Sequence, residues 1–452
     1  RSVPGPAAGA QFGKACIVVP DQNSDGFRDL LVGAPGFNSG RGAIYCISGT
    51  FLASGVGVST IWSLTPAANP GDNFGFALAD VGDVTGDGVH DFLVGQPGYD
   101  APSASDVGAV RLVHGSARVI VSLLHGTDSC CEQFGFSIAA CGDLNLNGFP
   151  DVAVGAPDYS VSLGLVRVFD GFALTQSGSV QGLSLASFGG QFYVDQVGWS
   201  VASGADFTGD GISEIVAGSP GRDHGSSFEA GRVIVYDVVE DERYFVDSLI
   251  GGERLGAAVS VGHDYDGDGV PDIVAGAPHS PNGSSHEVGR VVVYSGARVV
   301  AQTMPQEIYA FALTAPPGFV LPPPDFHFGE AVAAVDDLNN DGVGEILVGA
   351  PDFFTNSGAN AAYRGLVRIF SGATGAQFAN ITGASTDRLG DGIGAVLDDL
   401  DGDGFPEFAL GGSLADVGGV DSGGLKCFRL FPFPPAMYCA VTLNSLGCTP
   451  SM

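Results

Sequence analysis

The chain has 452 residues, of which 50 are Asp or Glu and 18 are Lys or Arg, and its formal net charge at pH 7 is −32. A surface of this sign argues against binding to a nucleic-acid backbone, which needs clustered Lys and Arg. No run of 18 apolar residues occurs, so the sequence contains no candidate membrane span. The 71 Gly and 26 Pro leave no stretch that favours a helix of about 10–12 residues, which indicates an all-β protein.

The first predicted element is the apolar run 16–19, which is followed by an acidic loop, 21–29, and by a second apolar run from Leu30. The same order returns six more times along the chain, and successive loops begin 58 to 73 residues apart. Internal repetition at roughly this period is typical of solenoids and propellers. The seven loops begin at Asp21, Asp83, Asp143, Asp206, Asp264, Asp337 and Asp399.

Each loop places oxygen-bearing side chains at its positions 1, 3, 5 and 9 and a Gly at position 6. Ca²⁺ takes about six to eight oxygen ligands, and a Gly allows the sharp turn that gathers them from one short segment. Position 7 is expected to offer its backbone carbonyl. The predicted ligands to up to seven Ca²⁺ ions are Asp21, Asn23, Asp25, Phe27 and Asp29; Asp83, Thr85, Asp87, Val89 and Asp91; Asp143, Asn145, Asn147, Phe149 and Asp151; Asp206, Thr208, Asp210, Ile212 and Glu214; Asp264, Asp266, Asp268, Val270 and Asp272; Asp337, Asn339, Asp341, Val343 and Glu345; Asp399, Asp401, Asp403, Phe405 and Glu407.

A polar turn is the alternative interpretation of any single loop, because Asp, Asn and Gly dominate turns. Seven copies with the same spacing of oxygens favour a metal site. The spacing differs from an EF-hand, since position 12 is an apolar strand residue such as Val32, so position 9 must complete the shell. The loops from Asp264 and Asp399 carry four carboxylates and are expected to bind most tightly, and the loop from Asp143 most weakly. We expect the ions to be structural, because a loop that fills the shell leaves little room for a substrate.

Three further runs complete each repeat. The run after the loop is apolar and mostly ends in Gly-Ala-Pro or a close variant, a third run is β-branched and aromatic, and a weaker fourth run precedes the next repeat. Four short strands in each of seven repeats fit radial blades around an axis, because that arrangement leaves only short sheet edges. The predicted fold is a seven-bladed β-propeller of four-stranded antiparallel blades, with the acidic loop between strands 1 and 2 of each blade.

Phe-Gly before the first strand and Gly-Ala-Pro after the second carry a resemblance to a known family. Phe-Gly occurs at 12–13, 74–75, 134–135 and 328–329, and Gly-Ala-Pro begins at Gly33, Gly155, Gly276 and Gly349. The pattern resembles the FG-GAP repeat, the unit of the seven-bladed propeller of integrin α subunits and of many secreted bacterial proteins. Three repeats depart from it, with Val197, Leu255 and Leu389 in place of Phe, and the last ends Gly-Gly-Ser.

The resemblance implies an organisation in two parts. Residues 1–430 would form the propeller, with the N-terminal few residues supplying the outer strand of blade seven, and 431–452 would be a linker or a truncated further module. The loops between strands 2 and 3, and those between strands 4 and 1, would lie on the face opposite the calcium loops, where integrin-like propellers bind ligands. Calcium use and the resemblance together imply an extracellular, secreted or cell-surface location.

Two groups of residues on that face are candidates for ligand contact. The first is the polar set Arg222, Asp223 and His224 of blade four with His279, His286 and Glu287 of blade five, which can also be read as ordinary loop chemistry. The second is aromatic: Phe353, Phe354 and Tyr363 of blade six, with Tyr99 and Tyr159 in equivalent loops, are candidates for exposed contacts, and packing of half of them against their own blade is the alternative. The Pro-rich insert 304–327 is expected to cover part of the same face.

Cysteines and glycosylation patterns leave alternatives open. Cys16 and Cys46, on strands 1 and 3 of one blade, are too far apart for a disulfide, whereas Cys439 and Cys448 could close a small loop. Asn282 and Asn380 match the N-glycosylation pattern, which also arises by chance.

Three functions are compatible with the fold, because propellers host all of them. The preferred one is a non-catalytic adhesion or ligand-binding module that recognises an extracellular protein or glycan. The alternatives are a structural surface component that self-associates into a layer or fibre, and a propeller-based polysaccharide lyase or hydrolase. The sequence contains no GxSxG, HExxH or Walker motif, so we expect no enzymatic activity and no catalytic residues.

Overall fold

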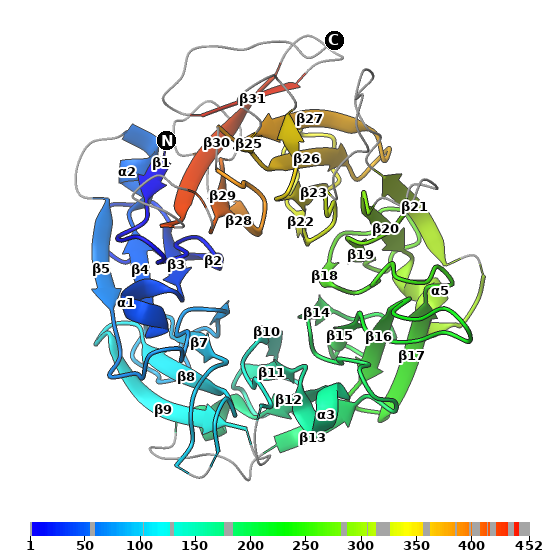
Figure 1. Ribbon diagram of the computed structural model, residues 1–452, viewed down its shortest axis with the longest axis horizontal. Coiled ribbons are helices and arrows are strands. Elements are labelled where there is room, and N and C mark those ends of the chain that lie inside the picture. Colours follow the sequence, from blue (N-terminus) through cyan, green and yellow to red (C-terminus); the bar gives the residue numbers. More distant parts are fainter. Residues whose placement is uncertain are drawn as a thin grey trace.

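Seven small antiparallel sheets are arranged in a ring around a central axis in the computed structural model (Figure 1). The structure describes residues 2–442 except 55–58, 103, 127–130, 176–183, 282–286, 305, 313–325, 356–361, 385–386, 397–398, 400–406, 414, 416–421 and 433–437. The predicted seven-bladed propeller of four-stranded antiparallel blades is confirmed.

The strands of each blade follow one another outward from the axis. Their bounds are, in blade one, β2 Cys16–Val19, β3 Asp29–Ala34, β4 Ala43–Ile47 and β5 Thr60–Leu64; in blade two, β6 Leu78–Asp80, β7 Phe92–Gln96, β8 Ala109–His114 and β9 Val119–His125; in blade three, β10 Ser137–Gly142, β11 Asp151–Ala156, β12 Leu165–Phe169 and β13 Ser184–Gly189; in blade four, β14 Val201–Ala205, β15 Glu214–Ser219, β16 Arg232–Asp237 and β17 Glu242–Asp247; in blade five, β18 Ala258–Val261, β19 Ile273–Ala277, β20 Arg290–Tyr294 and β21 Glu307–Ala312; in blade six, β22 Ala331–Val335, β23 Glu345–Ala350, β26 Leu366–Ser371 and β27 Gln377–Thr382; in blade seven, β28 Gly392–Val396, β29 Phe408–Gly412, β30 Gly424–Pro432 and β1 Ser2–Pro4.

A few short elements interrupt the blades. The hairpin of β24 (Phe354–Thr355) and β25 (Ala362–Tyr363) lies within the connection between β23 and β26. The helices of the described part have four to six residues each: α1 Phe37–Gly40, α2 Gly49–Ser54, α3 Tyr159–Ser162, α4 Gly171–Leu174 and α5 Gly296–Val300. The prediction that no repeat contains a long helix therefore agrees with the described part of the chain.

The second strand of each blade is the most deeply buried. All six residues of β3, β11, β15 and β23 are buried, because each of these strands has hydrogen-bonded neighbours on both sides and blades packed on both faces. Apolar side chains of neighbouring blades share one core: Val152 and Phe169 of blade three, for example, pack with Leu93 and Leu112 of blade two. The stability of the ring therefore depends on contacts between blades as well as within them.

The two glycines of the repeat motif meet at each blade boundary. A Cβ atom on Gly33 of blade one would lie 2.0 Å from the carbonyl oxygen of Gly75 in blade two, and a Cβ on Gly276 would lie 2.0 Å from that of Gly329. Within a blade, the Gly75 N–H donates to the Gly95 carbonyl oxygen at 3.0 Å. Only a residue without a side chain fits between these backbones, which explains why Gly recurs there.

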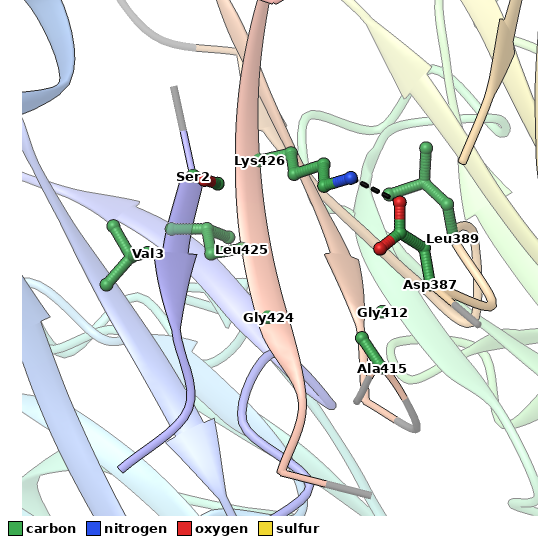
Figure 2. A pocket seen from close by; sticks show the side chains of 9 residues that line it. All are labelled: Ser2, Val3, Asp387, Leu389, Gly412, Ala415, Gly424, Leu425 and Lys426. Atoms are coloured by element: carbon green, nitrogen blue, oxygen red, sulfur yellow. Dashed lines mark hydrogen bonds and ion pairs between the residues drawn. The ribbon is translucent and has the colours of Figure 1, made fainter. Parts of the chain in front are cut away.

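The N-terminal strand closes the ring, as predicted. Strand β1 pairs antiparallel with β30, with Val3 opposite Leu425, and so provides the fourth strand of blade seven. Figure 2 shows this junction, where the Lys426 ammonium group forms an ion pair with the Asp387 carboxylate. Val3 is 5% exposed and packs into the core shared by blades seven and one.

The far end of β30 has a different partner. Strand β31 (Tyr438–Thr442) pairs with residues 428–432 of β30. The division of the chain into a propeller, 1–430, and a separate tail, 431–452, stays a prediction. Most of the insert 304–327 and the pattern at Asn282 lie outside the described residues, and so does Cys448. Cys16 and Cys46 are free thiols, as expected.

Candidate metal loops and ligand face

The first acidic loop is folded around the carboxylate at its position 1. Oδ1 of Asp21 accepts hydrogen bonds from the backbone N–H groups of Asn23, Ser24 and Asp25 at 3.0, 2.6 and 3.2 Å, and Oδ2 accepts from that of Gly26 at 2.7 Å. Burial alone would raise the pKa of Asp21, but these four donors outweigh it and hold the pKa below its usual range. The loop is thus shaped by its own acidic side chain.

The same hydrogen bond shapes five further loops. In each, the backbone N–H of the Gly at position 6 donates to Oδ2 of the Asp at position 1, at 2.6–2.8 Å. These pairs are Gly88 with Asp83, Gly148 with Asp143, Gly211 with Asp206, Gly269 with Asp264 and Gly342 with Asp337. The structure describes only Asp399 and Glu407 among the predicted ligands of the seventh loop.

The acidic residue at position 9 begins the second strand or directly precedes it, and it is buried in every blade; Asp29, for example, is 0% exposed. Its Oδ2 accepts from the Gln22 N–H at 2.6 Å and its Oδ1 from the Gly49 N–H at 2.9 Å. Asp151 and Asp272 repeat this pair of contacts in blades three and five. The position-9 carboxylate therefore ties the acidic loop to the segment that follows the third strand.

Burial makes five of the position-9 carboxylates hard to ionise in the absence of a cation. Burial, the largest cause, raises the pKa of Asp29 to about 6, of Asp272 to about 7 and of Glu345 to about 8. The pKa of Asp151 rises to about 6 and that of Glu214 to about 7 for the same reason. A cation held by the loop would supply the missing compensation for a buried negative charge.

Acidic oxygens converge in three of the loops. One oxygen from each member of three sets lies within 4.8 Å of the others: Asp206, Asp210 and Glu214; Asp264, Asp266 and Asp272; Asp337, Asp341 and Glu345. In the second loop, the buried hydroxyl of Thr85 at position 3 makes no hydrogen bond within the described part of the chain. A donor set of carboxylate, amide and hydroxyl oxygens fits a hard cation such as Ca²⁺.

Sequence reasoning missed the residues that follow the third strand and contact position 5. The Ser48 hydroxyl donates to Oδ2 of Asp25 at 3.3 Å, and the Ser295 hydroxyl donates to Oδ2 of Asp268 at 3.2 Å. Ser116 and Ser371 donate in the same way to Asp87 and Asp341, whereas Asp170 accepts from Nδ2 of Asn147 at 2.9 Å. The only sequence feature that marks these residues is their position, since each is a Ser or Asp at the end of the third apolar run or just after it.

The predicted polar set of blade four does not converge on a shared site. Nη1 of Arg222 lies 3.4 Å from Oδ1 of Asp195, while Oδ1 of Asp223 accepts from the Glu229 N–H at 2.8 Å. Nδ1 of His224 lies 3.5 Å from Oδ2 of Asp247. Each of the three side chains has its own local partner, so this set forms no acid/base constellation.

Exposed apolar side chains lie in the connections before, within and after blade four, and sequence reasoning missed them. The side chains of Phe192, Tyr193, Phe228 and Leu249 are 55%, 73%, 73% and 72% exposed. Arg222 stacks over the Phe192 ring at 4.2 Å from its centroid, and the Ser227 hydroxyl donates to the Leu249 carbonyl oxygen at 3.1 Å. We call Phe192, Tyr193, Phe228, Leu249 and Ile250 the blade-four patch. All five lie in connections between strands 2 and 3 or between strands 4 and 1, which places the patch opposite the acidic loops.

The structure shows the exposure of two of the aromatic candidates. The prediction that Phe353 is exposed is wrong: it is 8% exposed because it packs on Phe326, with ring centroids 5.3 Å apart. Tyr363 is 50% exposed, as expected. Phe354 lies in β24 opposite Tyr363, and its side chain, like all of His286, lies outside the described residues. His279 lies beside Glu287, with Nδ1 and Oε2 2.5 Å apart.

Comparison with known proteins agrees with the geometry. The FG-GAP repeat family matches residues 17–45, 134–169, 197–236, 255–294 and 328–369. Over 151 residues the chain is 34% identical to integrin α-6 of Gallus gallus, which covers 32% of this chain and 14% of that protein. Over 231 residues it is 29% identical to integrin α-5 of Xenopus laevis, which covers 48% of this chain and 20% of that protein. The matches therefore span a minor part of the relatives' own length.

Blade boundaries outside the matched segments have the same geometry, since Gly411 of blade seven meets Gly13 of blade one as Gly33 meets Gly75. The chain is a seven-bladed β-propeller that contains FG-GAP repeats in the five matched segments, and it resembles the propeller of integrin α subunits. The solved structure of Saccharomyces cerevisiae Sqt1 is similar with a TM-score of 0.48 and 9% identity, covering 89% of this chain and 82% of that one. Among the described residues, no helix has the length and apolar character needed to cross a membrane.

Proposed function

We propose that this protein is an extracellular, calcium-dependent adhesion module that binds a protein or glycan ligand without catalysis. The observation that carries the proposal is the chemical difference between the two faces of the ring. One face presents the same acidic loop from blade after blade, held by repeated hydrogen bonds. The other presents connections that differ from blade to blade, among them the blade-four patch. The similarity to integrin α subunits supports the same assignment.

The acidic loops have a structural role in this proposal. Each loop joins strands 1 and 2, and its position-9 carboxylate also holds the segment after strand 3, so a bound Ca²⁺ would fix three strands of one blade. The ions would keep the blades in register and so preserve the shape of the opposite face. Calcium is therefore required for ligand binding in this account although it does not touch the ligand.

The blade-four patch is the proposed centre of ligand contact. Exposed aromatic side chains are uncommon on a monomer surface outside interaction sites, and aromatic residues near an Arg are typical of protein and sugar contacts. Phe192, Tyr193 and Phe228 provide the aromatic surface, and Arg222 provides a cation that is already held in place by Asp195. A ligand with an apolar centre and an acidic group would match this arrangement.

The experiment is a binding screen of the purified chain against arrays of matrix proteins and glycans, in calcium and again in chelator. The proposal predicts at least one ligand that binds in calcium but not in chelator. The double variant Tyr193→Ser/Phe228→Ser should reduce its binding at least tenfold. Met304→Ser is the matched control, because Met304 is 80% exposed and lies in a connection between strands 3 and 4, on the acidic-loop face. The absence of any ligand for a protein that is folded in calcium, or equal losses in both variants, would contradict the proposal.

A further inference from the structure

Two histidines and a glutamate from neighbouring blades come together on the face opposite the acidic loops. His279 and Glu287 lie in the connection between β19 and β20 of blade five, and His327 lies just before the first strand of blade six. One nitrogen or oxygen ligand atom of each residue lies within 4.8 Å of the other two. The imidazole rings of His279 and His327 have their centroids 4.8 Å apart.

One distance in this cluster is close to the spacing of ligands around a small metal ion, and the other is a hydrogen-bond distance. Nδ1 of His279 lies 2.5 Å from Oε2 of Glu287, and Nε2 of His327 lies 3.7 Å from the same oxygen. In a tetrahedral Zn²⁺ site with bonds of about 2.0–2.1 Å, ligand atoms lie roughly 3.3–3.5 Å apart. Small side-chain rotations would therefore bring the three ligand atoms around one ion.

A second carboxylate orients His327 for metal binding. Oδ2 of Asp352 lies 2.7 Å from Nδ1 of His327, while Oδ1 of Asp352 pairs with the Arg388 guanidinium. Asp352 thus lies within hydrogen-bond distance of one ring nitrogen of His327 and is itself held by Arg388. The other ring nitrogen, Nε2, lies on the side of Glu287, and a carboxylate on the distal nitrogen is the usual support of a metal-binding His.

The repeat explains the contact of His327 with Asp352, which Gln133 and Asp158 make at 2.8 Å in blade three, but it does not explain the two histidines. Two positions before the Phe-Gly motif or its variant, other blades place a buried acid, at Asp72, Glu132, Asp195, Glu253 and Asp387. Blade six has the buried Phe326 at that position, with His327 beside it. At the position of His279, directly after the Pro of the Gly-Ala-Pro motif, blades three and six have Asp158 and Asp352. At the junction of blades five and six, Phe326 thus replaces the common acid, and His279 and His327 stand where blade three has Asp158 and Gln133.

We propose that His279, Glu287 and His327 form a binding site for one transition-metal ion of the Zn²⁺ class, distinct from the acidic loops. Imidazole nitrogen favours Zn²⁺ and related ions over Ca²⁺, which takes oxygen ligands. The side chains of His279, Glu287 and His327 are 26%, 44% and 23% exposed, so the ion would be reached from solvent. Three protein ligands leave a fourth position for water or for an oxygen atom of a bound ligand.

The test is a calorimetric titration of Zn²⁺ into the calcium-saturated protein, with Co²⁺ absorption as a report on tetrahedral nitrogen and oxygen ligation. We expect one Zn²⁺ per chain that remains in excess calcium. His327→Ala and Glu287→Gln should abolish this binding, and Asp352→Asn should weaken it about 10–100-fold through loss of the supporting carboxylate. His90→Ala is the matched control, because His90 also lies beside an Asp, at 3.0 Å from Asp80, but in blade two.

A measurement on the unaltered protein guards against variants that misfold. Zn²⁺ should protect His279 and His327, but not His90, from acylation by diethyl pyrocarbonate, as read by mass spectrometry. The proposal is overturned if the calcium-saturated protein takes up no Zn²⁺. It is also overturned if Zn²⁺ binds with equal affinity to folded His327→Ala and Glu287→Gln variants, or protects all three histidines alike.

Discussion

A Cβ atom on Gly411 would lie 2.1 Å from the carbonyl oxygen of Gly13, although the two residues come from opposite ends of the chain. The same relation joins Gly33 to Gly75 and Gly276 to Gly329 at boundaries between consecutive blades. The contact between blades seven and one is therefore the same glycine-to-backbone contact that joins consecutive blades. The inner edge of the ring shows no difference at the point where the two ends of the chain come together. The glycine of the second strand sets how closely the blades approach.

Substitution at this glycine should destabilise the ring. In Gly276→Ala the new methyl group would collide with the backbone at Gly329, which cannot move as a flexible side chain can. We expect the free energy of unfolding to fall by about 2–3 kcal/mol, as measured by chemical denaturation in calcium. Gly251→Ala is the control, because the nearest atom to its Cβ position is 3.4 Å away, and a change within about 0.5 kcal/mol is expected. Equal effects of the two variants would contradict the steric argument.

Ring closure depends on the buried side chain of the N-terminal strand. Val3→Asp would place a carboxylate against Leu425 in the core shared by blades seven and one, and we expect a loss of about 3 kcal/mol or more in the free energy of unfolding. Ser2→Asp, at the exposed neighbouring position, should change it by less than about 0.5 kcal/mol. If Val3→Asp unfolds at the same denaturant concentration as the parent chain, β1 does not close the propeller in solution.

The charge of a loop should set its calcium affinity. Asp266→Asn removes one of four carboxylates from the loop that begins at Asp264, and it should weaken calcium binding at that site roughly tenfold. Asn145→Asp adds a third carboxylate to the loop that begins at Asp143 and should strengthen binding there by a similar factor. Calcium titrations followed by heteronuclear NMR would resolve the glycines at position 6, Gly269 and Gly148. A calcium midpoint that does not move, or that moves against the direction predicted for its variant, would contradict a calcium role for these loops.

The stability of the calcium-free chain and the additional stability supplied by calcium should change in opposite directions with pH. Because burial raises the pKa of Asp272 to about 7 and of Glu345 to about 8, the calcium-free folded chain binds more protons than the unfolded chain between about pH 4 and 8. The calcium-free protein should therefore become more stable as the pH falls through this window. The additional stability supplied by calcium should shrink over the same window, since protons and Ca²⁺ compete for the same oxygens.

Thermal melts at intervals from pH 8 to pH 5 check this prediction. The difference in melting temperature between calcium and chelator should be largest at the alkaline end. A difference that stays constant, or grows as the pH falls, would show that the buried position-9 carboxylates are not the calcium ligands.

The propeller and its acidic loops could be predicted from sequence because they repeat. A position that returns seven times, such as the Asp at position 1 or the acid at position 9, has the same environment in each blade, so its chemistry can be inferred from spacing. The outer strand of blade seven could also be predicted, since residues 2–3 precede Phe12 much as residues 63–64 precede Phe74.

Features that occur once could not be predicted in this way. Phe353 was expected to be exposed, yet Phe326 from a distant connection covers it. The blade-four patch consists of apolar residues from three separate connections, and no periodic pattern marks such residues as exposed. His279 and His327 belong to different blades, so their approach follows only from the arrangement of the blades around the axis.

The most direct test of the central claim, that the acidic loops are calcium sites that hold the propeller together, is a thermal melt in calcium and in chelator. At a free calcium concentration of ten times Kd, each site would contribute about 1.4 kcal/mol, and seven sites on the order of 10 kcal/mol, which is comparable to the whole stability of a typical domain. We therefore predict that chelation lowers the melting temperature sharply and that added calcium restores it. A melting temperature that is the same in chelator and in calcium would contradict the account.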